Sequence, residues 1–337
     1  QPITAWGLIG AGIRAYDHMD GVGNRYGVHT VILEVDGEEV FRSVVDRFAY
    51  EENRYINSWT HGQYMKSFIE PGNRLRMLHA SNGNRGLVEI NEERPYRFVY
   101  TLSDALGNTS KVRFTVQGKN TEIHPVEHRE KYAFKWDRTN YLQEPGLELV
   151  VLRGMLYDDV WLDYSVRADS GDVAFTYQLH NKRVPLHGAC EMRIGLRRDR
   201  LEDKSKYYVA GVTARGGKYS IGGTYEDGFM KVRIRDLGTY TVAVDTVPPE
   251  IIPLNPGQWG RTGRITLKAK DKETGINSYR GTIDGKYALF GKPNSISGNL
   301  VCELDPKHVK KGGRHTVEMT VTDGRGNRTT EEFHFVW

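Results

Sequence analysis

The stretch YTLSDALGNTSKVRFTV, from Tyr100 to Val116, is repeated near the C-terminus as MTVTDGRGNRTTEEFHFV, from Met319 to Val336. Each copy has an alternating apolar and polar segment, then Asp-x-x-Gly-Asn, then a second alternating segment. Alternation with a period of two is typical of strands, and Gly and Asn favour a tight turn between them. Two copies of one hairpin, about 220 residues apart, predict two related β domains rather than one large catalytic domain.

The rest of the chain also alternates, and sustained helical periodicity is nearly absent. Stretches such as 265–269 and 112–116 place apolar side chains on one face of a strand. A chain of 337 residues is long enough for two or three domains. We therefore predict an all-β protein with three β-sandwich domains in series, of which the first and third are immunoglobulin-like or fibronectin type III-like.

The repeat and the prolines set the expected domain boundaries at residues 1–119, 120–244 and 245–337. The third domain opens with Asp245-Thr-Val-Pro-Pro, and two adjacent prolines suit a stiff segment that enters an edge strand. The first copy of the repeat has no such Pro-Pro segment. Its sandwich is therefore expected to lack its first strand.

Charge and cysteine content exclude some classes of protein. The formal net charge of +4 is small beside 47 basic and 43 acidic residues that are interspersed, so no nucleic-acid partner is predicted. No apolar run approaches the roughly 18 residues that a membrane span needs. Cys190 and Cys302 fall in different predicted domains, which favours two free thiols over a disulfide. The chain begins with Gln1 instead of Met, which suggests a processed chain or part of a longer one.

Two motifs resemble ligand sites but have simpler explanations. Gly10-Ala-Gly12-Ile-Arg-Ala15 matches a dinucleotide-binding pattern, yet the glycines and aspartates that follow would break the helix that such a site needs. Asp104 to Asn108 and Asp323 to Asn327 carry oxygen ligands of the kind that calcium prefers. Turn chemistry explains them without a metal, because Asp caps backbone amides and Gly accepts a positive φ. The pairs Asp20 with Asn24 and Asp271 with Asn277 are slightly more open to an ion.

The sequence offers no convincing catalytic site. None of the eleven histidines has metal-ligand spacing such as His-x-His or His-Glu-x-x-His, so no metal or cofactor is predicted in this chain. Asp158, Asp159 and Asp163 could serve as paired carboxylates of a hydrolase. Adjacent residues of a strand point to opposite faces, however, so Asp158 and Asp159 would not both face one substrate.

Aromatic side chains are the remaining candidates for ligand binding. Trp59, Trp259 and Tyr279 are possible platforms for a sugar or peptide, although a sandwich usually buries its tryptophan. Trp259 lies between Gly257 and Gly260 in a glycine-rich segment, which makes it the least core-like of them.

Several short stretches carry a resemblance to a known family. They are Trp6–Asp20, Tyr26–Val28, Asp36–Gly37, Asn53–Asn57, Pro71–Leu75, Met155–Asp159, Pro185–His187, Lys204–Tyr208 and Ile234–Tyr240. Together they resemble the non-catalytic region after the catalytic domain in secreted lysostaphin-type zinc metallopeptidases of Bacteroides-like bacteria, over nearly the whole chain. The resemblance implies an exported parent enzyme that cuts peptide cross-links of peptidoglycan in the cell envelope, at the periplasm or cell surface. The family's zinc-binding motifs, a His with a downstream Asp and a later His-x-His, cannot be placed here, so zinc is expected only in a missing peptidase domain.

We therefore expect a non-catalytic accessory region that positions or covers an upstream peptidase domain or binds cell-wall material. One alternative is a stand-alone surface module that binds carbohydrate or protein. A second alternative is a hydrolase that uses Asp158, Asp159 or Asp163.

Overall fold

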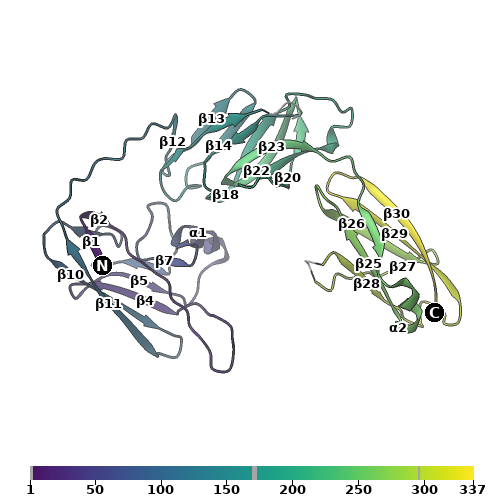
Figure 1. The fold of residues 1–337 in the computed structure, drawn as a ribbon, viewed down its shortest axis with the longest axis horizontal. Helices are drawn as coiled ribbons and strands as arrows, with labels where there is room; N and C mark the ends of the chain where they lie inside the picture. The colour runs from purple at the N-terminus through teal and green to yellow at the C-terminus, as the bar shows by residue number, and fades with distance from the viewer. Residues whose placement is uncertain (1–2, 169–172, 295–296) are drawn as a thin grey trace. The chain divides into compact units, whose positions relative to one another are not determined.

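The computed structural model describes residues 3–168, 173–294 and 297–337. About half of the residues lie in strands, and the described helices are short (Figure 1). They are α1 (Ile56–Trp59), α2 (Trp259–Thr262) and the 3-10 turns Tyr50–Tyr55, Lys204–Lys206 and Pro256–Gln258. None of these helices is long or apolar enough to span a bilayer. The predicted all-β fold class is confirmed.

The chain folds into two compact units. The first contains Gln1–Asn140, Val150–Leu162 and Val184–Cys190, and the second contains Tyr141–Leu149, Asp163–Arg183 and Glu191–Trp337. Because this division cuts across residues 120–244, it does not test the boundaries of three separate sandwiches, and that division stays a prediction.

The first unit is built around a six-stranded sheet that contains the first copy of the repeat. In spatial order its strands are β1 (Ile3–Ala5), β11 (Thr109–Gly118), β10 (Pro95–Ser103), β4 (Thr30–Val35), β5 (Glu38–Val44) and β8 (Leu78–Ala80). Smaller sheets pair β2 (Gly7–Ile9) with β9 (Val88–Ile90), join β3 (Gly12–Ile13), β7 (Tyr64–Lys66) and β6 (Thr60–His61), and pair β12 (Tyr132–Phe134) with β15 (Val160–Leu162). The segment Gly10–Ala15 thus contains the short strand β3 and loop, and it does not form the helix that a dinucleotide site needs.

The second copy of the repeat lies in a sandwich at the C-terminal end of the second unit. One sheet contains β24 (Glu250–Pro253), β25 (Arg264–Lys270) and β28 (Asn299–Glu303), and the other contains β27 (Lys286–Ala288), β26 (Ile276–Ile283), β29 (Arg314–Asp323) and β30 (Arg328–Val336). Alternate residues of both sheets, including Leu267, Leu300 and Met319, are fully buried in one core. Period-two patterning therefore predicts which face of each strand is buried.

Two further five-stranded sheets lie before this sandwich. One has the order β13 (Asn140–Glu144), β14 (Leu147–Val151), β18 (Val184–Gly195), β22 (Phe229–Leu237) and β21 (Thr224–Glu226). The other has the order β16 (Ser165–Arg167), β17 (Thr176–Gln178), β23 (Thr239–Val244), β19 (Tyr207–Val212) and β20 (Lys218–Gly222). The second of these sheets carries the groove described below.

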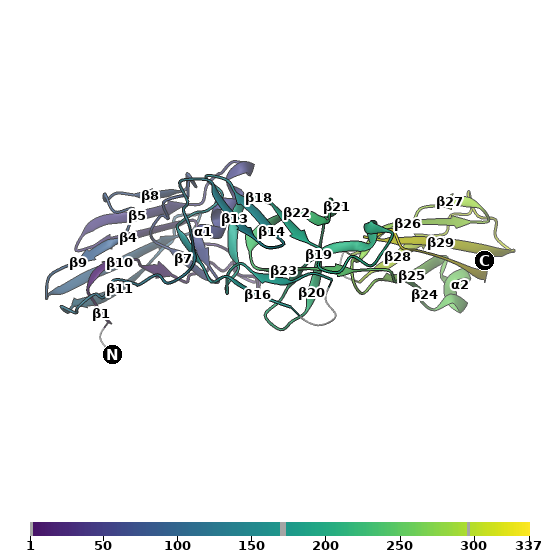
Figure 2. The ribbon, with the colours of Figure 1, turned by 90° about the horizontal axis from the view of Figure 1, so that it is seen from above.

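Helix α2 lies beside the end of β30 in both views of the fold (Figures 1 and 2). Gly260 permits this approach, because a Cβ at that position would lie 1.7 Å from the carbonyl oxygen of Val336. We expect Gly260→Ala to lower the free energy of unfolding of the C-terminal sandwich by about 2 kcal/mol, since backbone must move to make room. Urea denaturation measures this loss. Gly257→Ala, with open space around its Cβ, is the matched control.

A buried histidine of the same sandwich is hydrogen-bonded to the carboxylate of Asp284. His315 is 6% exposed; its Nδ1 lies 2.7 Å from Oδ2 of Asp284, and its Nε2 lies 2.8 Å from the carbonyl oxygen of Lys310. The hydrogen bond from His315, with another from the Thr316 amide, lowers the pKa of Asp284 below its ordinary value of 3.8. A carboxylate with a lowered pKa stabilises the fold above its ordinary pKa, and this stabilisation is lost as the pH falls through the lowered value.

We therefore expect Asp284→Asn to be less stable than the wild type at neutral pH and to lose less stability between about pH 5 and pH 2. Urea midpoints of the wild type and the variant across this range measure the effect. Glu332→Gln removes an exposed carboxylate from β30 and should leave the acid dependence unchanged. Parallel pH profiles of Asp284→Asn and the wild type would contradict the role given to this pair.

Candidate functional site

The Asp-x-x-Gly-Asn turns have the structure that the sequence predicts. In the first copy, Oδ1 of Asp104 accepts the amides of Leu106 and Asn108, and Nδ2 of Asn108 donates to Oδ2 of Asp104. Gly107 has a φ of 90°, which favours glycine. The second copy repeats these bonds, from the amides at 325 and 327 and from the Asn327 side chain to Asp323. Both copies therefore form the hydrogen-bonded turn that the sequence predicts.

The two turns differ in their surroundings. The turn at Asp104 is largely exposed, whereas Asp323 is fully buried and Asn327 is 7% exposed. Nδ2 of Asn327 also donates to the carbonyl oxygen of Asp245, at 3.0 Å. The second turn is thereby tied to the residue that directly follows β23.

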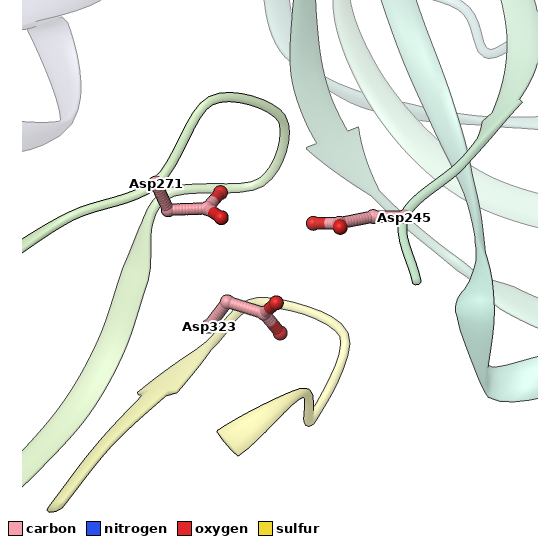
Figure 3. Close-up of side chains that lie close together, drawn as sticks. All are labelled: Asp245, Asp271 and Asp323. Carbon is pink, nitrogen blue, oxygen red and sulfur yellow. The ribbon is translucent and has the colours of Figure 1, made fainter. Parts of the chain in front are cut away.

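Three carboxylates converge at this turn within the second unit. Asp245 follows β23, Asp271 follows β25 and Asp323 ends β29, and their side chains point toward one another (Figure 3). One oxygen from each lies within 4.8 Å of the others. Oδ2 of Asp245 accepts the hydroxyl of Thr274 at 2.5 Å, while Oδ2 of Asp271 accepts the amides of residues 273–275.

Among the residues that the structure describes, these three aspartates form the group that could hold a metal ion. Carboxylate oxygens are ligands that hard divalent cations such as calcium prefer. From the sequence, Asp271 was a better candidate ion ligand than the aspartates of the Asp-x-x-Gly-Asn turns, but the partner predicted for it was Asn277. The actual neighbours, Asp245 and Asp323, come from strands that are distant in sequence, so spacing alone could not identify them.

A second feature of the same unit is a polar groove with a volume of about 660 Å³, within the usual range for ligand sites. It lies on the sheet β16-β17-β23-β19-β20. Its lining residues are Ser165, Arg167, Thr176, Gln178, His180, Asn181, Lys182, Arg183, Val212, Thr213, Ala214, Gly216, Tyr219, Gly238 and Thr239. We call it the sheet groove. Most of these residues carry a hydroxyl, an amide or a positive charge, and none is an Asp or Glu.

Strand register explains why these residues meet. Ser165 is directly opposite Gln178, Arg167 is opposite Thr176, and Gln178 is in turn opposite Thr239. Directly opposite residues of an antiparallel pair point to the same face of the sheet. The three strands thus present a row of polar side chains on a rigid backbone.

The loop after β17 supplies charge to the rim of the groove. Nη2 of Arg183 lies 2.5 Å from Oδ2 of Asp236, and this hydrogen bond raises the pKa of Arg183. Oδ1 of Asp236 accepts the hydroxyl of Tyr240 at 2.7 Å, so the carboxylate is itself fixed. Arg167 and Lys182 are both exposed, and neither has an ion-pair partner among the residues that the structure describes.

Tyr219 on β20 adds an aromatic ring to the groove. It is 37% exposed and lies opposite Gly211, where a Cβ would be 2.3 Å from the tyrosine Cζ. The ring therefore packs against the backbone of β19 while part of it faces solvent.

The structure buries two of the three predicted aromatic platforms, Trp59 and Trp259. Trp259 is 2% exposed, and its Nε1–H donates to the carbonyl oxygen of Leu254 at 2.8 Å. The prediction that Trp259 is the least core-like is wrong, because the neighbouring Gly260 allows tight packing. Trp59 is 6% exposed and donates to the carbonyl oxygen of Lys66. Tyr279 is half-buried against the C-terminal core, with Nζ of Lys292 5.2 Å from its ring centroid.

The three aspartates of the hydrolase alternative have different surroundings. Oδ2 of Asp159 lies 2.8 Å from Nζ of Lys135, and its Oδ1 accepts the Trp136 amide. Asp158 has an exposed side chain, but desolvation and the negative charges of Glu70 and Asp159 raise its pKa. Asp163 belongs to the second unit, and its amide donates to Nδ1 of His180. Asp159 is thus held by an ion pair, which disfavours a role in proton transfer.

The sequence did not identify the sheet groove as a candidate site. The adjacent basic residues Lys182 and Arg183 were a weak signal, but the residues they meet come from five strands and two loops. The order β16-β17-β23-β19-β20 brings them together, and this order depends on pairing between distant segments. The glycine-rich segment around Trp259, in contrast, is easy to see in the sequence, but the tryptophan that it singled out is buried.

Comparisons with known proteins give one family match. Residues 131–245, about a third of the chain, match the Zu5-like domain, and every residue that lines the sheet groove lies within them. No curated protein sequence matches the chain significantly.

Solved structures with some similarity have low scores. They include the Bacteroides ovatus mixed-linkage glucan utilisation protein SGBP-B, in complex with a mixed-linkage heptasaccharide (11% identity, 99% of this chain, 65% of that chain, TM-score 0.16). A Ca²⁺-stabilised adhesin that helps an Antarctic bacterium bind ice has 11% identity over 92% of this chain and 89% of that chain, with a TM-score of 0.18. The human desmocollin-1 ectodomain has 11% identity over 75% of this chain and 47% of that chain, with a TM-score of 0.20. TM-scores this low do not support any conclusion about this chain. The comparisons therefore show that residues 131–245 are similar to Zu5-like domains, and they show no family for the whole chain.

Proposed function

We propose that this chain is a non-catalytic binding module of an exported protein and that the sheet groove is its ligand site. The observation that carries the proposal is the groove itself, in which polar side chains of paired strands line a volume of about 660 Å³. A site built on strands is preorganised, because cross-strand hydrogen bonds fix the backbone before the ligand binds. Among the two alternatives to the peptidase-accessory role, the surface binding module fits this geometry better.

Neutral and charged polar groups on one rigid face suit a ligand rich in hydroxyl groups. Ser165, Gln178 and Thr239 provide both donors and acceptors along the row of strands. The exposed face of Tyr219 offers a surface on which the apolar face of a sugar ring can lie. Carbohydrate of the cell envelope is therefore the ligand class that we favour over protein.

The link to a peptidase remains a prediction from the sequence resemblance. The coding sequence upstream of Gln1 tests it: a domain with His, a downstream Asp and His-x-His at zinc spacing would support an accessory region. The function proposed for the groove does not depend on that outcome, because the groove residues all belong to this chain.

Incubation of the purified chain with insoluble cell-envelope polysaccharide and with peptidoglycan tests the proposed function. We expect the chain to sediment with one of these materials, saturably and reversibly, without releasing soluble fragments. The same incubation with added zinc should also release none. Release of muropeptides or sugar fragments would contradict the non-catalytic proposal, and a failure to bind any envelope material would contradict the binding role.

A further inference from the structure

The sheet groove carries more information about its ligand than its polarity alone. Its rim has three basic side chains, Arg167, Lys182 and Arg183, and none of the described residues that line it is acidic. Asp236 neutralises only Arg183, through the 2.5 Å contact described above. Within the described residues, Arg167 and Lys182 thus leave two positive charges without a counter-charge beside a row of neutral hydrogen-bonding groups.

We propose that the sheet groove binds a carboxylate-bearing oligosaccharide, such as a chain of uronic acid residues. This inference rests on the proposed function and specifies its ligand class. The carboxylates would pair with Arg167 and Lys182, because hydrogen bonds between ionised partners are about twice as strong as neutral ones. The sugar hydroxyls would bind Ser165, Gln178 and Thr239, while one ring lies on Tyr219.

The arrangement of the basic residues favours this class over other polyanions. Arg167 ends β16, at the strand edge of the sheet, and Lys182 lies in the loop after β17, so the two cations flank a row of uncharged groups. A ligand with charges separated by hydroxyl-rich units matches this pattern. Nucleic acid would require an extended basic surface, and the chain's charges are interspersed with a net value of only +4. An acidic peptide would match the two cations but would leave the hydroxyl and amide row without comparable partners.

Isothermal titration calorimetry of the full chain tests the proposal with three probes. They are a short oligogalacturonide, a neutral gluco-oligosaccharide of the same length and poly-L-glutamate with a similar number of carboxylates. We expect the oligogalacturonide to bind at least about tenfold more tightly than either of the others, with an affinity that falls as salt is added.

Two variants locate the interaction. The double variant Arg167→Gln with Lys182→Gln should weaken oligogalacturonide binding roughly 10- to 100-fold and weaken binding of the neutral oligosaccharide much less, because glutamine removes the charge but keeps a hydrogen-bonding group. Tyr219→Ala should weaken the binding of both sugars, because it removes the stacking surface. Lys111→Gln with Arg113→Gln is the matched control, since it removes the same charge from exposed positions of β11.

Each contrary outcome has a defined meaning. If the neutral sugar binds as tightly as the oligogalacturonide, the inference is overturned while the proposed function stands. Equal binding of poly-L-glutamate, or an equal loss in the β11 control, would also overturn it, because general charge attraction would then account for the binding. If no probe binds a chain whose circular dichroism spectrum is that of a folded β protein, the inference is likewise overturned. The co-sedimentation experiment then decides the proposed function separately.

Discussion

Replacing Trp259 with alanine is expected to lower the free energy of unfolding of the C-terminal sandwich by about 3–5 kcal/mol. The side chain is 2% exposed and is among the largest fully enclosed residues of the chain. Its ring lies edge-on to Phe333 and Phe335, each with a centroid 6.2 Å away. The substitution therefore removes a large apolar contact and leaves the carbonyl oxygen of Leu254 without its donor.

Urea denaturation followed by circular dichroism measures this loss, and hydrogen exchange at the β25 and β29 amides assigns it to the C-terminal sandwich. Trp259→Phe should fall between the wild type and alanine, because it keeps a ring but removes the indole donor. Tyr287→Ala is the control: its side chain is 63% exposed, so a change of less than about 0.5 kcal/mol is expected. A wild-type stability for Trp259→Ala would show that the ring is not part of the core.

The second large effect is expected at the buried copy of the repeated turn. Asn327→Ala should lower the free energy of unfolding by about 3 kcal/mol, because its Nδ2 donates both to Asp323 and to the carbonyl oxygen of Asp245. Without this donor, the negative charges of Asp245 and Asp323 would repel each other with one hydrogen-bond donor fewer to offset the repulsion. Both residues are about 1% exposed or less, so solvent could not replace the lost donor.

The equivalent substitution in the first copy is the matched control. Asn108 is exposed and makes the same side-chain bond to Asp104, at 2.6 Å, where water can take over the role of the amide. Asn108→Ala should therefore cost no more than about 1 kcal/mol. Thermal denaturation of both variants gives the comparison, and equal losses would mean that burial does not distinguish the two turns.

Local sequence signals predicted the strands and turns well. The segments predicted as strands at 265–269 and 112–116 lie in β25 and β11, and both Asp-x-x-Gly-Asn turns have the expected hydrogen bonds. Residues 160–167 are divided between two strands, β15 and β16, although no proline or glycine interrupts the sequence there. Local alternation cannot show this break, because it is the pairing of each half with a different partner strand that separates them.

Long-range features were less accessible from the sequence. Trp259 looked exposed because glycines flank it, yet Gly260 serves close packing against Val336. The carboxylates of Asp245, Asp271 and Asp323, and likewise the sheet groove, are assembled from segments that strand order brings together. No spacing rule within one segment reports such an arrangement. The domain boundaries and the link to a zinc peptidase remain predictions from the sequence.

Hydrogen–deuterium exchange of the full chain with and without bound oligogalacturonide tests the central claim most directly, because it locates the ligand and shows whether that ligand stays intact. The account predicts slower exchange in β16, β17 and residues 180–183, with the oligosaccharide recovered at its original length. Protection confined to other strands, or recovery of shortened oligosaccharide, would contradict a non-catalytic module that binds through the sheet groove.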